Sequence, residues 1–269
     1  MKDTLKDSHD IPVQPAATLV IFRNPPASVG TGASAGSPPE LLMVTRSGKL
    51  AFAGGATVFP GGRVDPADAD LARQIAMPGD IDESAARIAA IRETLEETGL
   101  VVGIAGRIDA VSAAEARAML LETGAIAPVL KQFGWSIAAD ALTPFARWLP
   151  KLKHKRIFDT RFFLADLGTG NVEVAADRTE NTQLFWSSAQ STLDLADRGD
   201  LSIIFPTRRN LERLAQFDSF DAVRRHALSI PVGIVTPELD ESGPEPVLRI
   251  PEGLGYPVTF QTLREASIA

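Results

Sequence analysis

Apolar and polar residues follow a strand-like pattern in the first part of the chain. The apolar run from Ala16 to Arg23 predicts a buried strand, and Glu40 to Arg46 predicts a second one. Between them, Asn24 to Pro39 is rich in Pro, Gly, Ser and Ala, which is typical of an exposed loop. The stretch from Phe52 to Phe59 combines β-forming residues with two glycines and ends in the turn Pro60-Gly61-Gly62.

A helical pattern replaces the strand pattern after this turn and predicts a helix from Ile81 to Thr98. Asp80 and Glu83 have the spacing of a capping box at its start. Gly99 suits the left-handed position that ends a helix. The buried side of the helix would be formed by Ala85, Ile88, Ala89, Ile91 and Leu95.

The rest of the chain gives more scattered predictions. The segment between Gly62 and Glu83 contains Pro66, Pro78 and several aspartates, which favour a surface excursion with a short helix around Ala69 to Ala76. Ser112, with Glu115 three residues on, is expected to cap the next helix. Further elements are predicted at Val101–Ile108, Arg161–Leu167 and Gln183–Trp186 as strands, and at Ser112–Thr123, Ser187–Arg198, Pro206–Phe217 and Phe220–Leu228 as helices.

Composition narrows the class of protein. The 269 residues, 45% of them hydrophobic, suffice for a well-buried core. The formal charge of -7 argues against a nucleic-acid partner bound through bulk electrostatics. Cysteine is absent, so thiolate metal sites and cysteine nucleophiles are excluded. The polar start, Met1 to Asp10, and the lack of a long apolar run indicate a cytoplasmic protein without a membrane span.

Three carboxylates on the predicted helix are the main candidates for chemistry. Glu93, Glu96 and Glu97 stand at i, i+3 and i+4, so they project from one face. Two carboxylates about 4 Å apart repel by roughly 4 kcal/mol at an effective dielectric near 20, so a partly buried cluster favours a divalent cation. Oxygen ligands favour Mg²⁺, with Mn²⁺ as the alternative. Taken alone, such a pattern is more often a solvated helix face.

The residues around this cluster resemble the box motif of the Nudix hydrolases. Arg92, Glu93, Glu96, Glu97, Gly99 and Leu100 occupy the positions of its second half, with Thr94 where an aliphatic residue is usual. The first half departs from the motif. Twenty residues separate Gly62 from Glu83 where the motif usually has five, and Ser84 takes the in-frame position.

A second pattern is similar to the signature of the long-insert Nudix proteins of the peroxisomal coenzyme A diphosphatase type. Leu42, Arg46, Ser47, Gly55 and the run from Phe59 to Gly62 match this signature in register. Met43, Val44 and Ala51 depart from it, and Ala51 removes an arginine.

The resemblance implies an α+β fold, the Nudix fold, in which a mixed β-sheet is sandwiched between helices. We expect a single domain over residues 1–269, with a core at about 14–190, an insertion at 63–82 inside the box and a helical C-terminal extension at about 200–269. The implied activity is divalent-metal-dependent hydrolysis of a pyrophosphate bond in a nucleoside diphosphate-linked small molecule, with coenzyme A or acyl-coenzyme A favoured. The alternatives are an ADP-ribose or NADH diphosphatase and a non-catalytic nucleotide sensor, and a homodimer stays open as the assembly.

The resemblance also suggests roles for single residues. Glu93 would act as the base, Arg92 would orient the glutamates, and Glu180 is a rival base, with Glu173 as a weaker candidate. The implied metal ligands are Glu96, Glu97, Glu93 and the carbonyl of Gly62, and the implied substrate-binding residues are Arg46, Ser47, Gly55, Phe59 and Gly61.

Two basic segments are further candidates for phosphate binding. The first contains Lys151, Lys153, His154, Lys155 and Arg156, although such charge runs are more often solvated loops. Thr207 could begin a helix whose N-terminus, with Arg208 and Arg209, binds an anion, and an ordinary helix cap explains it equally well. The three histidines, His9, His154 and His226, lie far apart, so we expect no histidine metal cluster.

Overall fold

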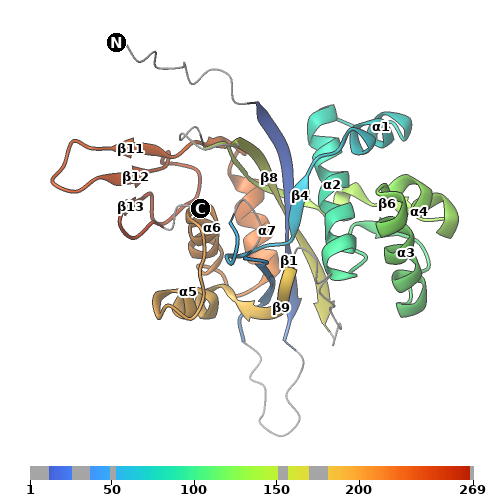
Figure 1. Ribbon diagram of the computed structural model, residues 1–269, viewed down its shortest axis with the longest axis horizontal. Helices are drawn as coiled ribbons and strands as arrows, with labels where there is room; N and C mark the ends of the chain where they lie inside the picture. The colour runs from blue at the N-terminus through green and yellow to red at the C-terminus, as the bar shows by residue number, and fades with distance from the viewer. Residues whose placement is uncertain (1–11, 26–36, 49–52, 151–156, 170–180, 267–269) are drawn as a thin grey trace, which may run out of the picture.

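A mixed β-sheet forms the centre of the molecule (Figure 1). The computed structural model describes residues 12–25, 37–48, 53–150, 157–169 and 181–266. Strands β1 and β8 run parallel, as do β10 and β7, whereas the other pairs in this sheet are antiparallel. The order is β10 (Ile234–Val235), β7 (Thr143–Trp148), β8 (Ile157–Thr169), β1 (Val13–Asn24), β2 (Glu40–Arg46) and β3 (Thr57–Val58), with β4 (Gly61–Arg63) paired to β1 and β9 (Asn181–Ser188) paired to β2.

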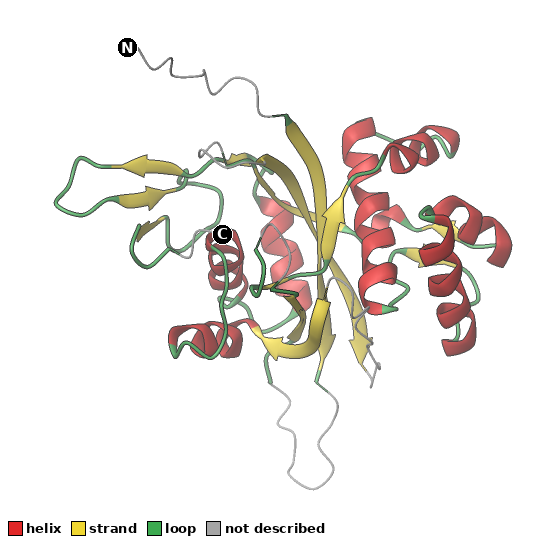
Figure 2. Cartoon of the chain, in the orientation of Figure 1, coloured by secondary structure: helices red, strands yellow, loops and turns green. Residues whose placement is uncertain are grey.

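Helices cover both faces of this sheet (Figure 2). Strand β1 shows the cause, because its alternate side chains enter two separate cores: Leu19 and Ile21 on one face, and Val20 and Phe22 on the other. One face carries α1 (Pro66–Gln74), α2 (Ile81–Thr98), α3 (Ala110–Thr123) and α4 (Ile126–Phe133), and the other carries α5 (Ala189–Asp197), α6 (Phe205–Leu214) and α7 (Phe220–Ser229). The predicted sandwich of helices around a mixed sheet is therefore confirmed.

Helix α2 has the predicted bounds, but its start differs in detail. Asp80 is the N-cap and accepts a hydrogen bond from the backbone of Asp82, and Gly99 ends the helix at φ 78°. The predicted capping box is wrong, because Glu83 pairs with Arg87 one turn further on, at 2.8 Å. Its apolar face lies against the sheet, which fixes the direction in which the later glutamates project.

The insertion before α2 is not only a surface excursion. It forms α1, which starts at Pro66, three residues before the predicted helix, and buries Asp68, Leu71 and Ala72. Leu71 and Ala72 join the core under α2. The inserted segment is thus packed against the helix that carries the candidate carboxylates.

Several other predictions need correction. The predicted strand at 101–108 shrinks to β5 (Ile104–Ala105), which pairs with β6 (Ser136–Ile137) in a separate small sheet. Asp109, not Ser112, caps α3, and Ser112 is the partner three residues on. Helix α4 and the short 3₁₀ turn at Ala139–Ala141 were not predicted.

The C-terminal part is not purely helical. Strand β10 joins the edge of the central sheet, and β11 (Glu238–Asp240), β12 (Val247–Arg249) and β13 (Phe260–Thr262) form a small antiparallel sheet beside α6. In the described part of the chain, no helix combines the length and apolar character needed to cross a membrane.

Candidate metal centre

The candidate carboxylates lie where the last two turns of α2 meet β4. The backbone N–H of Gly61 donates to Oε2 of Glu97 at 3.0 Å. Gly62 faces Glu93 so closely that a Cβ atom at Gly62 would overlap the Glu93 carboxylate. Any larger residue at this position would displace the carboxylate, so the glycine turn and the helix form one unit.

Burial makes the negative charge of this cluster costly. Desolvation raises the pKa of Glu93 to about 7, and the nearby charge of Glu96 adds to this effect, whereas Arg92 opposes it. Desolvation also raises the pKa of Glu97 to about 8, and the charge of Glu93 contributes. Glu96 is more open, with 36% of its side chain exposed. The cluster thus holds more negative charge than its protein neighbours offset.

Arg92 is the cation closest to these carboxylates, and its guanidinium is almost fully buried. It donates to Oε1 of Glu93 at 2.9 Å and to the backbone carbonyl of Arg63 at 2.9 Å. It also binds both carboxylate oxygens of Asp68, at 3.1 and 3.0 Å. Desolvation lowers the pKa of Arg92, but its hydrogen bonds to Asp68 and the charges of Glu93 and Asp68 outweigh this effect, so the pKa is raised.

Asp68 is the most informative residue that sequence reasoning missed. It comes from the insertion, is 1% exposed and holds Arg92 with two parallel hydrogen bonds. Five residues separate Gly62 from Asp68, which is the spacing expected for the acidic residue in the first half of the box. The prediction that Glu83 is a displaced box residue is therefore wrong, because the extra residues follow Asp68. This spacing was visible in the sequence.

The edge of the cluster is formed by two neighbouring strands. Arg46 on β2 lies opposite Asn181 on β9. Both act on Glu97, since a side-chain hydrogen bond from Asn181 and the positive charge of Arg46 each lower its pKa. Asn181 is fully buried and was not predicted. No local pattern in the sequence marks Asn181, because its position beside Arg46 depends on the register between β2 and β9.

The substrate-binding candidates are only partly brought together. Gly55 donates to the carbonyl of Arg46 at 3.1 Å, and this bond closes the loop that follows Ser47. Phe59 instead packs into the core on the α6 and α7 face, so the prediction that it contacts substrate is wrong.

Some of the residues named in the predictions lie outside the described part of the chain. They are Glu173, Glu180, Ala51, His9 and the basic segment from Lys151 to Arg156.

The second basic candidate, at the start of α6, has a structural explanation. Helix α6 begins at Phe205 with Ile204 as N-cap, so Thr207 does not cap it. Arg208 pairs with Asp197 at 2.7 Å, and Arg209 pairs with Glu212 at 2.7 Å. The predicted anion site is therefore replaced by ion pairs.

The oxygen-rich cluster on α2 has the right chemistry for Mg²⁺ or Mn²⁺. Glu93, Glu96 and Glu97 supply only hard oxygen donors, and two of them are buried with raised pKa values, which a divalent cation would offset. Their oxygens do not converge on one point. Among the described residues, no group of three acidic or histidine side chains is arranged to hold a metal ion. Glu93 contacts Arg92, and Glu97 contacts Gly61.

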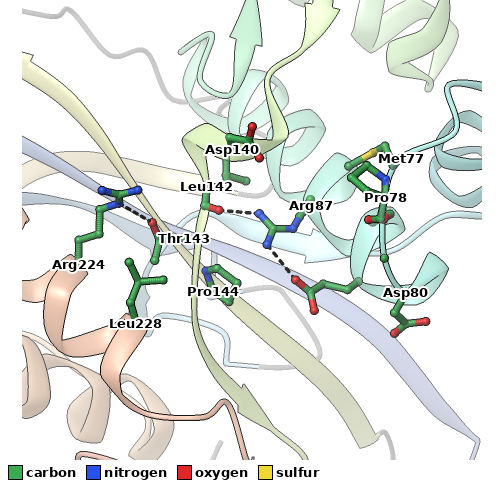
Figure 3. A pocket seen from close by; sticks show the side chains of 13 residues that line it. Met77, Pro78, Asp80, Arg87, Asp140, Leu142, Thr143, Pro144, Arg224 and Leu228 are labelled. Carbon is green, nitrogen blue, oxygen red and sulfur yellow. Dashed lines mark hydrogen bonds and ion pairs between the residues drawn. The ribbon is translucent and has the colours of Figure 1, made fainter.

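A cavity lies at the other end of α2 (Figure 3). Its volume is about 420 Å³, and Asp80, Arg87, Thr143 and Arg224 are among the residues that line it. Arg87 donates to the Leu142 carbonyl, and Arg224 donates to Thr143 at 3.4 Å. At 1.5 Å per residue, the helix places this cavity roughly 20 Å from the carboxylate cluster. It is therefore separate from the candidate metal centre.

Comparison with known proteins agrees with the fold and with the position of the cluster. The model of the NUDIX domain matches residues 33–202, which is more than half of the chain and includes the whole interrupted box. The chain therefore belongs to the Nudix family.

Two relatives show how far this similarity extends. A NUDIX hydrolase from Alicyclobacillus acidocaldarius has a solved structure that matches with a TM-score of 0.66 and 25% sequence identity, over 80% of this chain and 97% of that chain. A Caenorhabditis elegans protein named "Putative nudix hydrolase 7" is 25% identical over 187 residues. That match covers 70% of this chain and 59% of the length of the relative.

Proposed function

We propose that this protein is a divalent-metal-dependent hydrolase that cleaves a pyrophosphate bond in a nucleoside diphosphate-linked substrate. Coenzyme A or an acyl-coenzyme A is the substrate that we favour. The observation that carries the proposal is the burial of Glu93 and Glu97 against the Gly61-Gly62 turn. Burying more carboxylates than there are cationic partners destabilises the folded protein, and a bound divalent cation would offset that cost. Such clusters are typical of functional sites.

Glu93, Glu96 and Glu97 would hold Mg²⁺, with the carbonyl of Gly62 as a further ligand. When bound, the ion supplies positive charge that offsets the charge on the diphosphate oxygens. Arg92 holds the carboxylate of Glu93 in one orientation through its 2.9 Å hydrogen bond, and Asp68 holds Arg92 in turn. This chain of contacts holds Glu93 in place before the substrate arrives.

Glu93 is our proposed base. Its carboxylate is largely buried, with 16% of its side chain exposed, so a water molecule at its open side would have few competing partners. It would take the proton of the attacking water as the bond between phosphorus and the bridging oxygen breaks. Glu180, outside the described residues, is the rival for this role.

The residues at the edge of the cluster support a diphosphate substrate. Arg46 is close enough to lower the pKa of Glu97 by its charge, so it stands beside the proposed metal ligands. Its Nε atom is buried and has no hydrogen-bond acceptor among the described residues. A phosphate oxygen could supply that acceptor. Arg46, Ser47 and Gly55, three residues of the coenzyme A pattern, belong to one loop closed by the hydrogen bond from Gly55.

The proposal is tested by incubating the protein with Mg²⁺ and coenzyme A, ADP-ribose, NADH or a nucleoside triphosphate, and separating the products. We expect coenzyme A to give 4'-phosphopantetheine and adenosine 3',5'-bisphosphate. Turnover of ADP-ribose or NADH alone would keep the reaction but replace the substrate. Binding of any of these compounds without turnover would refute the enzyme and favour a nucleotide sensor.

A further inference from the structure

Helix α3 reaches the metal-binding end of α2 from outside the box motif. Ala116 and Leu120, one turn apart on α3, are fully buried in the core that α2 also enters. Arg117 follows Ala116, so this docking directs its side chain toward the end of α2. Its guanidinium lies beside Gly99, since a Cβ atom at Gly99 would be 3.5 Å from Nη1 of Arg117, an ordinary van der Waals contact.

Arg117 binds the backbone of two of the proposed metal ligands. Its Nε donates to the carbonyl of Glu96 at 3.0 Å, and its Nη2 donates to the carbonyl of Glu97 at 3.1 Å. The last carbonyls of a helix lack partners within the helix and carry its negative dipole end, so a cation there is stabilising. The last turn of α2, which is described in full, contains no basic residue of its own.

These contacts restrain Glu97 at both ends. Its carbonyl is held by Arg117, and its carboxylate is held by the N–H of Gly61. The other end of the turn is closed by Gly99, whose N–H donates to the carbonyl of Leu95 at 3.0 Å. If the turn frayed, the helical geometry that sets the directions of the Glu96 and Glu97 side chains would be lost.

We infer that Arg117 is a positioning residue that fixes the last turn of α2 and so sets the affinity of the site for its divalent cation. This inference rests on the proposed function only in that Glu96 and Glu97 bind metal. It extends the site to α3, an element outside the box. Both of these hydrogen bonds are accepted by backbone carbonyls, so they hold the helix turn and leave the carboxylate oxygens as the ligands.

The test is the dissociation constant of Mn²⁺, measured without substrate on the full chain by electron paramagnetic resonance. Arg117→Met keeps most of the side-chain length but removes the donors, and we expect it to raise the dissociation constant by about 10-fold. Arg117→Lys keeps a cation with rotatable donors and should recover part of this loss. Arg198→Met is the matched control, because Arg198 makes an exposed ion pair with Asp200 outside the site.

The outcomes separate positioning from simple stability. A weaker Mn²⁺ affinity in Arg117→Met, partly restored in Arg117→Lys and absent in Arg198→Met, supports the inference. Wild-type Mn²⁺ affinity in Arg117→Met overturns it, even if the thermal unfolding temperature falls. If Arg117→Met does not fold, a folded Arg117→Ala takes its place, and wild-type Mn²⁺ affinity in that variant overturns the inference as well. A wild-type protein that binds Mn²⁺ but hydrolyses nothing would refute the proposed function and leave this test valid.

Discussion

Both faces of the central sheet bury charged side chains, but the two sets differ in sign and in the partners that surround them. On the α2 face, Glu93 and Glu97 are buried acids whose pKa values are raised by desolvation and by neighbouring carboxylates. On the α6 and α7 face, the buried cations include Arg209 and Arg213, each 2% exposed. The first face gathers like charges, whereas on the second Arg209 is paired with Glu212 and Arg213 lies among neutral groups.

The neighbours of Arg213 explain why its buried charge needs no ligand. Its guanidinium donates to the carbonyl of Phe145 at 3.1 Å and lies over the rings of Phe145 and Tyr256, at 4.2 and 5.3 Å from their centroids. Desolvation raises the pKa of Tyr256 to about 12, and its hydroxyl accepts from Trp148 at 2.9 Å. This charge is satisfied within the protein. The comparison teaches that an unbalanced buried cluster, rather than burial itself, indicates function.

Replacing one acid on the α2 face should have the largest effect. Glu97→Gln keeps the size of the side chain but removes a metal ligand, so we expect Mn²⁺ affinity to fall by about 100-fold. Thermal unfolding of the metal-free protein should not be impaired, because the variant removes a desolvated charge. The measurement is the unfolding temperature with and without Mn²⁺. An equal metal-induced rise in Glu97→Gln and wild type would show that the cluster is not the binding site.

The second-largest effect should come from the ion pair that supports this cluster. Asp68→Ala leaves Arg92 buried without its main partner, so we expect the free energy of unfolding to fall by about 3 kcal/mol. Asp70→Ala, on the same helix, breaks an exposed pair with Arg73 and should change little. Denaturant unfolding of both variants provides the comparison. Equal stability of the two would show that the buried pair contributes nothing.

The smallest effect is expected on the α6 and α7 face, from pH. Desolvation and the charge of Arg213 lower the pKa of His226, whose ring accepts from Arg213 at 3.4 Å. The unfolded state therefore binds more protons below the ordinary histidine pKa near 6.5, and the associated stability is lost as pH falls through that range.

The test is the change in unfolding temperature between pH 7 and pH 5 in wild type and in His226→Gln, which keeps an acceptor but cannot be protonated in this range. The loss on acidification should be smaller in the variant, by on the order of 1–2 °C. A larger loss in the variant would contradict the lowered pKa.

Sequence reasoning succeeded where the signal is local. The bounds of α2 follow from periodicity and from Gly99, and the spacing of its glutamates placed them on one face. The reasoning failed where partners are distant in sequence. Strand β7 was not predicted, because Pro144 lies within it and proline disfavours a strand, although the partners β8 and β10 complete its pairing. Asn181 and Arg117 reach the site only through strand register and helix docking.

Asp68 is an intermediate case. Its spacing from Gly62 is present in the sequence, but two acidic neighbours, Asp65 and Asp70, made the segment read as polar surface. Burial separates these three carboxylates, because Asp68 is 1% exposed and accepts two hydrogen bonds from Arg92, whereas Asp65 lies 3.7 Å from Arg92 and Asp70 forms an exposed pair with Arg73.

The central claim is that the buried acids of the α2 face form a metal-dependent catalytic site. The most direct test is the rate of coenzyme A hydrolysis with Mg²⁺, measured side by side for wild type and a folded Glu97→Gln. The account predicts Mg²⁺-dependent turnover in wild type that vanishes on chelation, and a rate lower by about 100-fold or more in the variant. Equal rates in the two proteins, or wild-type turnover that persists without any divalent metal, would contradict it.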